Sequence, residues 1–135
     1  MSSSRNFNAR SGNAVVTANA PAPLPVFSQA IKTKDMIYVS GNVGMDPHTN
    51  QLVPGGVKSQ TAQILKNLQA TLEAAGSGLG KVIKINVYIT DMRNFAEMNE
   101  AYLGVFEEPQ PARTCVQVVG LPFGAQVEME CHALP

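Results

Sequence analysis

The chain has 135 residues, and ten Lys and Arg residues balance ten Asp and Glu residues. This length suits one domain with one hydrophobic core. We expect a flexible tail over residues 1–13 and a single domain over residues 14–135. The first acidic residue is Asp35, so the chain beyond it is mildly acidic, and it has no basic run that would attract a polyphosphate. Nucleic acid is therefore not an expected partner.

The sequence has no segment with the length and apolar character of a membrane span, and residues 1–13 lack the apolar core of a secretory signal. We therefore expect a cytoplasmic protein with no membrane partner and with reduced thiols. Residues 1–13 contain Ser, Asn and Arg but no acid, which makes a mitochondrial targeting segment the alternative to a flexible tail. The tail is favoured because the segment has no clear amphipathic pattern.

The first half of the predicted domain is a short strand, an extended Pro-containing loop and a hairpin. The strand covers residues 14–17, and the prolines that follow exclude helix. The hairpin covers residues 27–33 and 36–41, and residues 46–51 form a turn. Residues 36–39 are apolar on both faces of their strand, which is typical of a strand that is covered on both sides.

Two helices and a strand follow. Apolar residues at helical spacing predict one long helix over residues 57–75, with Gly76 as its C-terminal cap. Residues 82–90 alternate between apolar and polar side chains and predict a half-polar strand. A second helix near residues 94–106 would bury Phe95, Met98, Tyr102 and Phe106 and end before Pro109.

The last two predicted strands alternate in the same way, and a Gly-Leu-Pro-Phe-Gly segment between them resembles a hairpin turn. In a hairpin the apolar residues of both strands share one face of the sheet. The opposite face would then gather Arg113, Cys115, Glu128, Glu130 and His132 as a candidate anion site. Cys115 and Cys131 would lie on opposite faces, out of reach of a disulfide.

This order of elements predicts an α+β fold, with a single mixed sheet of about six strands and two helices on one face. The doubly apolar strand at residues 36–39 also needs a cover on the second face, and the chain has no further element to provide one. A neighbouring subunit is the economical cover. The Arg113 face would then lie at or beside a subunit interface, where small-molecule pockets are common.

Short motifs run through the chain at residues 27–31 (FSQAI), 38–41 (YVSG), 46–47 (DP), 60–61 (QT), 67–68 (NL), 72–76 (LEAAG), 91–92 (DM), 98–100 (MNE), 111–116 (PARTCV), 121–122 (LP) and 127–130 (VEME). In these motifs and their order, the sequence resembles the RidA (YjgF) family of imine deaminases over roughly residues 15–134. The resemblance implies a chorismate-mutase-like trimer, in which sheets pack together inside a ring of helices and ligand clefts lie between subunits. The second sheet face would thus be buried by trimerisation.

Arg113 is the strongest candidate for substrate binding. Its planar guanidinium matches a carboxylate through two parallel hydrogen bonds, whereas the alternative is an interfacial salt bridge to Glu128 or Glu130. Cys115 is expected to line the pocket and not to act as a nucleophile, because no signature places a His beside it. Glu128 is the proposed catalytic residue that handles water, and Glu130 is the structural acid.

The resemblance adds the remaining site residues. It places Asn99 and the strand end at Ser40 and Gly41 in the substrate-binding site, together with Phe27. Many members have Tyr at the position of Phe27, so a phenolic hydroxyl is missing from the cleft. The segment 107–110 is also shorter than in bacterial members. Both departures concern substrate preference more than fold.

The expected function is hydrolysis of reactive enamine and imine intermediates, 2-iminobutanoate and 2-iminopropanoate, to 2-oxo acids and ammonia. The expected partners are a small carboxylated imine or 2-oxo acid and other copies of the chain. No metal-ligand spacing occurs, so neither metal nor cofactor is expected. Two alternatives are an endoribonuclease or translation inhibitor, and a trimer that binds metabolites or acts as a chaperone without catalysis.

Overall fold

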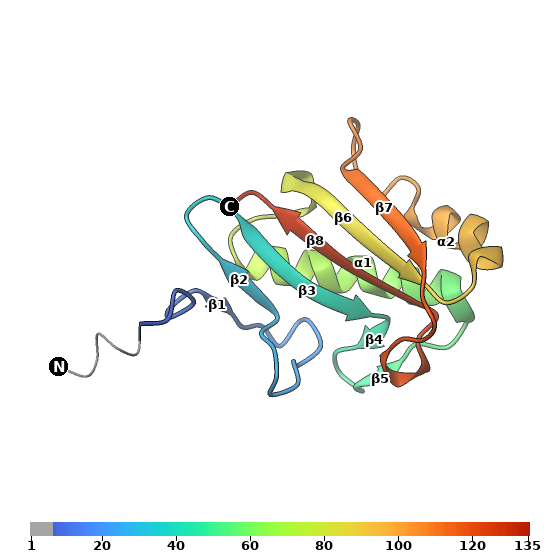
Figure 1. Ribbon diagram of the computed structural model, residues 1–135, viewed down its shortest axis with the longest axis horizontal. Coiled ribbons are helices and arrows are strands. Elements are labelled where there is room, and N and C mark those ends of the chain that lie inside the picture. Colours follow the sequence, from blue (N-terminus) through green and yellow to red (C-terminus); the bar gives the residue numbers. More distant parts are fainter. Residues whose placement is uncertain (1–6) are drawn as a thin grey trace.

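A six-stranded mixed sheet forms the centre of the molecule in this computed structural model, which describes residues 7–135 (Figure 1). The strands are β1 (Ala14–Val15), β2 (Ala30–Lys32), β3 (Ile37–Val43), β4 (Met45–Asp46), β5 (Gln51–Leu52), β6 (Val82–Ile89), β7 (Ala112–Gln117) and β8 (Val127–Ala133). The helices are α1 (Gly56–Ala74) and α2 (Phe95–Tyr102), with short 3-10 turns η2 (Leu79–Lys81), η3 (Met92–Asn94) and η4 (Pro122–Gly124).

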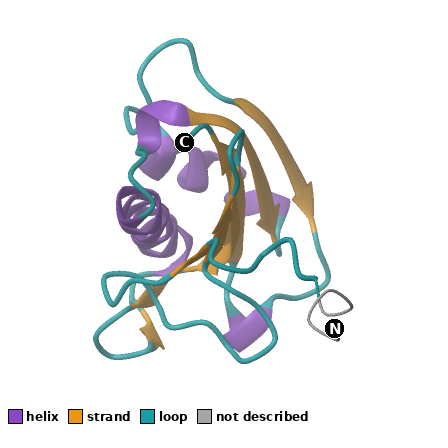
Figure 2. Cartoon of the chain, turned by 90° about the vertical axis from the view of Figure 1, so that its left-hand side faces the viewer, coloured by secondary structure: helices purple, strands orange, loops and turns teal. Residues whose placement is uncertain are grey.

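The strand order across the main sheet is β1-β2-β3-β8-β6-β7. Every neighbouring pair is antiparallel except β6 and β7, which are parallel. Both helices cover the same face of this sheet, and within residues 7–135 no α-helix covers the other face (Figure 2). The predicted α+β fold, with about six strands and two helices on one face, is confirmed. The small ribbon of β4 and β5, which flanks the predicted turn, was not anticipated.

Helix α1 forms because its apolar residues recur along one face. Ile64, Leu68 and Leu72 are fully buried against the sheet. The helix ends at Ala74, shortly before Gly76, whose φ of 79° is left-handed, and the amides of Gly76 and Ser77 donate to carbonyls of the last turn. The predicted helix over residues 57–75 is thus confirmed within one residue at each end.

Helix α2 is shorter than the predicted span of residues 94–106. It begins after η3, where the Asp91 side chain accepts a hydrogen bond from the Arg93 amide. It ends at Tyr102, and Gly104 follows with a left-handed φ of 82°. Phe106 is buried as predicted, although it lies beyond the helix. None of the helices in residues 7–135 is both long and apolar enough to cross a membrane.

Strands β7 and β8 do not form the predicted hairpin, because β6 lies between them. Ile85 of β6 is paired with Arg113 on one side and with Cys131 on the other. Paired residues point to the same face, and Ile85 is buried beneath the helices. Arg113 therefore faces the helices, whereas alternation along β8 turns Glu128 to the open face.

The prediction that Arg113, Cys115, Glu128, Glu130 and His132 share one face is therefore wrong. Alternation divides a strand into two faces, but it does not say which strand lies alongside. The segment between the strands is a longer connection that passes the end of β6. The two cysteines face the same side of the sheet, not opposite sides, and both are free thiols. Residues 1–6, part of the predicted tail, lie outside the described residues.

Candidate active site

A β-bulge in β3 shapes the open face of the sheet. Val39 pairs with Cys131 and Asn42 pairs with Met129, so Ser40 and Gly41 together lie opposite a single residue of β8. Bulges of this kind bend a strand and release backbone groups from the ladder. The Ser40 hydroxyl donates to the Ser28 carbonyl at 2.6 Å, which ties the bulge to the segment before β2.

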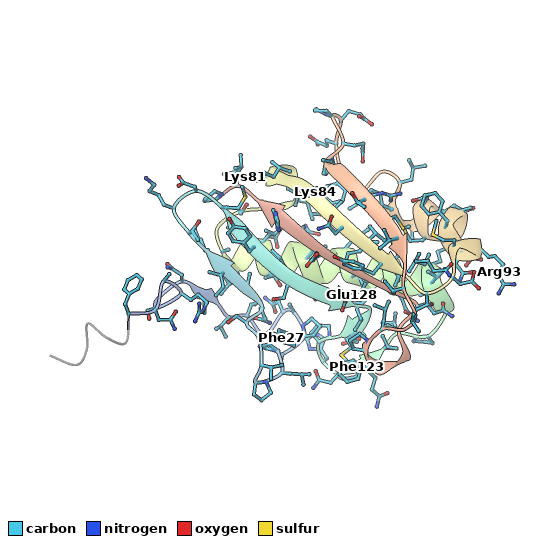
Figure 3. All side chains as sticks on the ribbon, viewed as in Figure 1. Phe27, Lys81, Lys84, Arg93, Phe123 and Glu128 are labelled. Carbon is cyan, nitrogen blue, oxygen red and sulfur yellow. The ribbon has the colours of Figure 1, made fainter. Side chains whose placement is uncertain are left out.

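A cleft of about 520 Å³ opens beside this bulge. Its walls come from the segment before β2, from β3 and β8, and from η4. Phe27, Phe123 and Glu128, which are labelled in Figure 3, are among its lining residues. The lining residues include Ala20, Leu24, Phe27, Ser40, Gly41, Val43, Tyr88, Phe123, Glu128 and Glu130. The structure therefore brings together four of the predicted site residues, Phe27, Ser40, Gly41 and Glu128.

Glu128 lies directly against the backbone of Gly41. A Cβ atom on Gly41 would be 3.0 Å from the Glu128 carboxyl carbon and 3.2 Å from each oxygen. Burial raises the pKa of Glu128, and the negative charge of Glu130 raises it further. A carboxyl group with a raised pKa exchanges protons closer to neutral pH, as a general acid or base requires.

Glu130 has a different environment although it lies two residues away on the same face. Its Oε2 accepts a hydrogen bond from the Tyr88 hydroxyl at 2.6 Å and one from the Asn86 amide at 3.2 Å. The bond to Glu130 raises the pKa of Tyr88, so that hydroxyl stays protonated and donating. Two hydrogen bonds thus hold the Glu130 carboxylate in place, and its structural role stays a prediction.

Arg113 lies on the opposite face, against helix α2. Its guanidinium carbon is 4.8 Å from the ring centroid of Tyr102 and 5.7 Å from that of Phe95, and Nη1 is 4.0 Å from the Met98 sulfur. Aromatic faces attract a cation without consuming its hydrogen-bond donors. Within residues 7–135, Arg113 forms no salt bridge to a carboxylate.

Cys115 and Asn99 lie on the helix side with Arg113. Burial raises the pKa of the Cys115 thiol, and the positive charge of Arg113 only partly offsets this effect. A thiol with a raised pKa is a poor nucleophile, which fits the expected lining role. Asn99 is half-buried on α2, next to the Met98 that contacts Arg113.

The predicted site residues thus form two groups on opposite faces of one sheet. Tyr88 and Asn86, which hold Glu130, were not predicted as site residues. Alternation along residues 82–90 had placed both on the polar face of that strand, which is the signal that could have found them. Among residues 7–135, no group of three or more His, Cys, Asp or Glu residues is arranged to hold a metal ion.

Known proteins resemble this chain in both sequence and fold. The family model described as Endoribonuclease L-PSP matches residues 17–134. A mouse protein named 2-iminobutanoate/2-iminopropanoate deaminase is 44% identical over 120 residues, which cover 89% of this chain and 89% of the mouse protein. A RutC family protein of Pyrococcus horikoshii is 45% identical, over 88% of this chain and 94% of that protein.

Solved structures agree with these sequence matches. RidA from a Psychrobacter species superposes with a TM-score of 0.87 at 42% identity, over 90% of this chain and 98% of that chain. TdcF of E. coli, solved with bound serine, gives a TM-score of 0.85 at 34% identity, over 90% and 98% of the two chains. A fold and a sequence that agree over almost the whole domain identify the chain as a member of the RidA/YjgF family.

Proposed function

We propose that this protein hydrolyses reactive imines of small 2-imino acids, such as 2-iminobutanoate and 2-iminopropanoate, to 2-oxo acids and ammonia. The observation that carries the proposal is the Arg113 guanidinium, which is held by two aromatic rings and has no carboxylate partner among residues 7–135. A guanidinium in this state suits the carboxylate of a small acid. The deaminase name of the mouse relative supports the same reaction.

The chemistry requires orientation and one proton-transfer group. Water adds to the electrophilic imine carbon and forms a carbinolamine; its carbon–nitrogen bond then breaks, and ammonia leaves as the carbonyl forms. Glu128, whose pKa is raised by burial, takes a proton from the attacking water and passes it to the imine nitrogen as the carbinolamine forms. It then takes the carbinolamine hydroxyl proton and passes it to the leaving nitrogen, so both water protons end on ammonia. Arg113 holds the carboxylate in place, which lowers the entropic cost of reaching the transition state.

Both groups can serve one substrate only if they come from different subunits, because Arg113 and Glu128 lie on opposite faces of the sheet. We therefore place the active site between chains of a homotrimer, with the Phe27 and Glu128 cleft of one subunit facing Arg113 of the next. Tyr38 and Val116, 48% and 44% exposed on the open face, suit burial by another subunit. Sedimentation should show one species near three times the 14.4 kDa subunit mass.

The test couples a threonine dehydratase to the purified protein and follows the formation of 2-oxobutanoate. The wild type should accelerate this step, and Arg113→Ala should lose the acceleration. Arg93→Ala is the matched control, because Arg93 is an exposed arginine that pairs only with its neighbour Asp91. An Arg113→Ala variant as fast as the wild type would refute the assignment.

The family description also names an endoribonuclease, so RNA cleavage is the second candidate. Phosphodiester cleavage usually needs an acid and a base close together. The two histidines do not form such a pair: His48 lies in an exposed turn, and His132 packs edge-on against Tyr38. Cleavage of single-stranded RNA that copurifies through several columns and vanishes in Glu128→Ala would reverse this ranking.

A third candidate is metabolite binding without turnover, and the Phe27 side chain in the cleft is the feature that favours it. Calorimetry with 2-oxobutanoate, compared with the deaminase assay, separates binding from catalysis. If the wild type binds 2-oxobutanoate but does not accelerate deamination, and Phe27→Tyr gains deaminase activity, the site of this protein binds a metabolite without catalysis.

A further inference from the structure

The segment that precedes β1 forms a turn that is attached to the edge of the sheet beside β2. The Asn13 amide donates to the Arg10 carbonyl at 3.0 Å, and the Arg10 amide donates to the Asn8 side chain at 2.9 Å. The Asn13 carbonyl accepts a hydrogen bond from the Lys32 amide at 2.9 Å, which attaches this turn to the end of β2. Arg10 is therefore presented by a hydrogen-bonded turn fixed to the sheet.

Arg10 lines a second hollow of about 350 Å³. The other lining residues are Pro25, Val26, Phe27, Ser28, Ile31 and Ser40. Phe27 and Ser40 also line the cleft that contains Glu128, so the two hollows share a wall. A ligand that occupied both hollows would pass Phe27 and Ser40, the two residues that the hollows share.

The charges of the two hollows differ. The main cleft contains Glu128 and Glu130 and no basic residue, whereas the second contains Arg10 and no acid. Within residues 7–135, Arg10 forms no salt bridge, and no acid precedes Asp35 in the sequence. Its guanidinium is therefore free to bind an anion next to the candidate active site. Arg10 also precedes residues 17–134, which match the family model.

We propose that Arg10 binds the second carboxylate of a short dicarboxylic substrate, the imine of an acidic amino acid, while its reacting carbon lies in the Glu128 cleft. This proposal rests on the proposed imine hydrolysis, for which it names a substrate class. A guanidinium accepts a carboxylate through two parallel hydrogen bonds. A monocarboxylic substrate has no second carboxylate that could bind to Arg10. Arg10 would therefore favour dicarboxylic over monocarboxylic substrates.

The first experiment measures binding alone, by calorimetry with 2-oxoglutarate and 2-oxobutanoate as product probes. The wild type should bind 2-oxoglutarate about tenfold more tightly than 2-oxobutanoate, the range expected for one charge-assisted contact at an accessible site. Arg10→Gln should remove this preference and leave 2-oxobutanoate binding unchanged. Lys66→Gln is the control, because it removes the same charge from an exposed position on α1.

The second experiment compares deaminase rates on 2-iminobutanoate and on the imine that an amino-acid oxidase forms from glutamate. Arg10→Gln should lower kcat/KM about tenfold for the dicarboxylic imine only. Equal affinity of the wild type for both probes, or an unchanged preference in Arg10→Gln, would overturn the role of Arg10. A wild type that binds 2-oxoglutarate through Arg10 but deaminates neither imine would refute the proposed function and keep Arg10 as an anion site.

Arg10 could instead pair with an acid of a neighbouring subunit, and the same variant tests this. In that case Arg10→Gln would weaken the assembly in sedimentation at low concentration and would affect both probes equally. That result would overturn the proposal. If Arg10 instead has no partner in a neighbouring subunit, as we propose, the wild type and Arg10→Gln should sediment alike.

Discussion

Arg113 and Glu128 are both half-buried ionisable residues on one sheet, but their surroundings affect charge in opposite ways. Aromatic rings beneath Arg113 favour its positive charge. Burial and the nearby Glu130 disfavour the negative charge of Glu128 and raise its pKa. The first group is suited to hold an anion, and the second to exchange a proton. Because they occupy opposite faces, the proposed function requires each subunit to contribute one of them to a neighbouring site.

The largest expected effect comes from two single variants, one lacking the Arg113 side chain and the other lacking the Glu128 carboxyl group. Arg113→Ala and Glu128→Ala should each lower kcat/KM by about 100-fold or more, because one removes the carboxylate contact and the other the proton-transfer group. Subunits of the two variants, mixed and reassembled at equal amounts, should regain activity. Random mixing in a closed ring restores both groups at about a quarter of the interfaces.

The control is each variant reassembled alone, which should stay inactive. Activity of the mixture that stays at the level of the single variants would contradict a site shared between subunits. In that case Arg113 and Glu128 would not act on the same substrate molecule. Arg113 would then not bind the imine that is hydrolysed beside Glu128.

A smaller effect is expected from the backbone contact under Glu128. In Gly41→Ala the new Cβ would lie 3.0–3.2 Å from the Glu128 carboxyl group, which must move aside. The carboxyl is the end of a flexible side chain, so the melting temperature should change little while kcat falls about tenfold, as expected for a misplaced general base. Gly80→Ala is the control, because its Cβ would meet no atom within 4 Å.

The raised pKa of Glu128 also predicts how stability depends on pH. Below its ordinary pKa of 4.5, Glu128 is protonated in both folded and unfolded chains. As the pH rises toward the raised folded pKa, the unfolded chain loses this proton first, so the folded state loses stability. Glu128→Gln lacks this loss. Its melting temperature relative to the wild type should therefore increase as the pH rises above 4.5, and it should become constant once the pH exceeds the raised pKa of Glu128 in the folded chain.

An unchanged difference in melting temperature across this range would show that the Glu128 carboxyl is well solvated in the assembled protein. Glu130→Gln provides the comparison on the same face. Because Tyr88 and Asn86 donate hydrogen bonds to the Glu130 carboxylate, this variant should lose stability at neutral pH.

The sequence predicts most accurately the helices and strands that are defined by the spacing of apolar residues within one segment. Helix α1 was located within one residue, because its apolar face and Gly76 together define where it lies and ends. Strand β6 was located within one residue at its end for a similar reason. Helix α2 was predicted too long, because Phe106 continues the apolar spacing although the chain has already turned at Gly104.

The candidate site was predicted in part, for a physical reason. Ser40, Gly41 and Glu128 lie together at one cleft because β3 and β8 are neighbouring strands. Their roles in the site remain predictions. The face of Arg113 was assigned incorrectly, because strand order is a property of the whole sheet and the local pattern does not contain it. The contacts of Arg113 with Tyr102 and Phe95 likewise depend on how α2 packs against β7.

The smallest expected effect compares two tyrosine hydroxyls, one on each side of the sheet. The Tyr102 hydroxyl is buried without a hydrogen-bond partner among residues 7–135, whereas the Tyr88 hydroxyl donates to Glu130 at 2.6 Å. Tyr102→Phe should raise the free energy of unfolding by about 1 kcal/mol, because it removes a desolvated group that makes no bond. Tyr88→Phe should lower it by about 1 kcal/mol through the lost bond.

Denaturant unfolding at one fixed protein concentration measures both changes, since assembly contributes to stability in a concentration-dependent way. Tyr102→Phe keeps the ring beneath Arg113, so deaminase activity should stay near that of the wild type. Tyr88→Phe frees the Glu130 carboxylate to move relative to Glu128 and should shift the pH profile of kcat. A destabilised Tyr102→Phe would mean that the Tyr102 hydroxyl has a partner in the assembled protein, and the two sides of the sheet would then no longer differ in this respect.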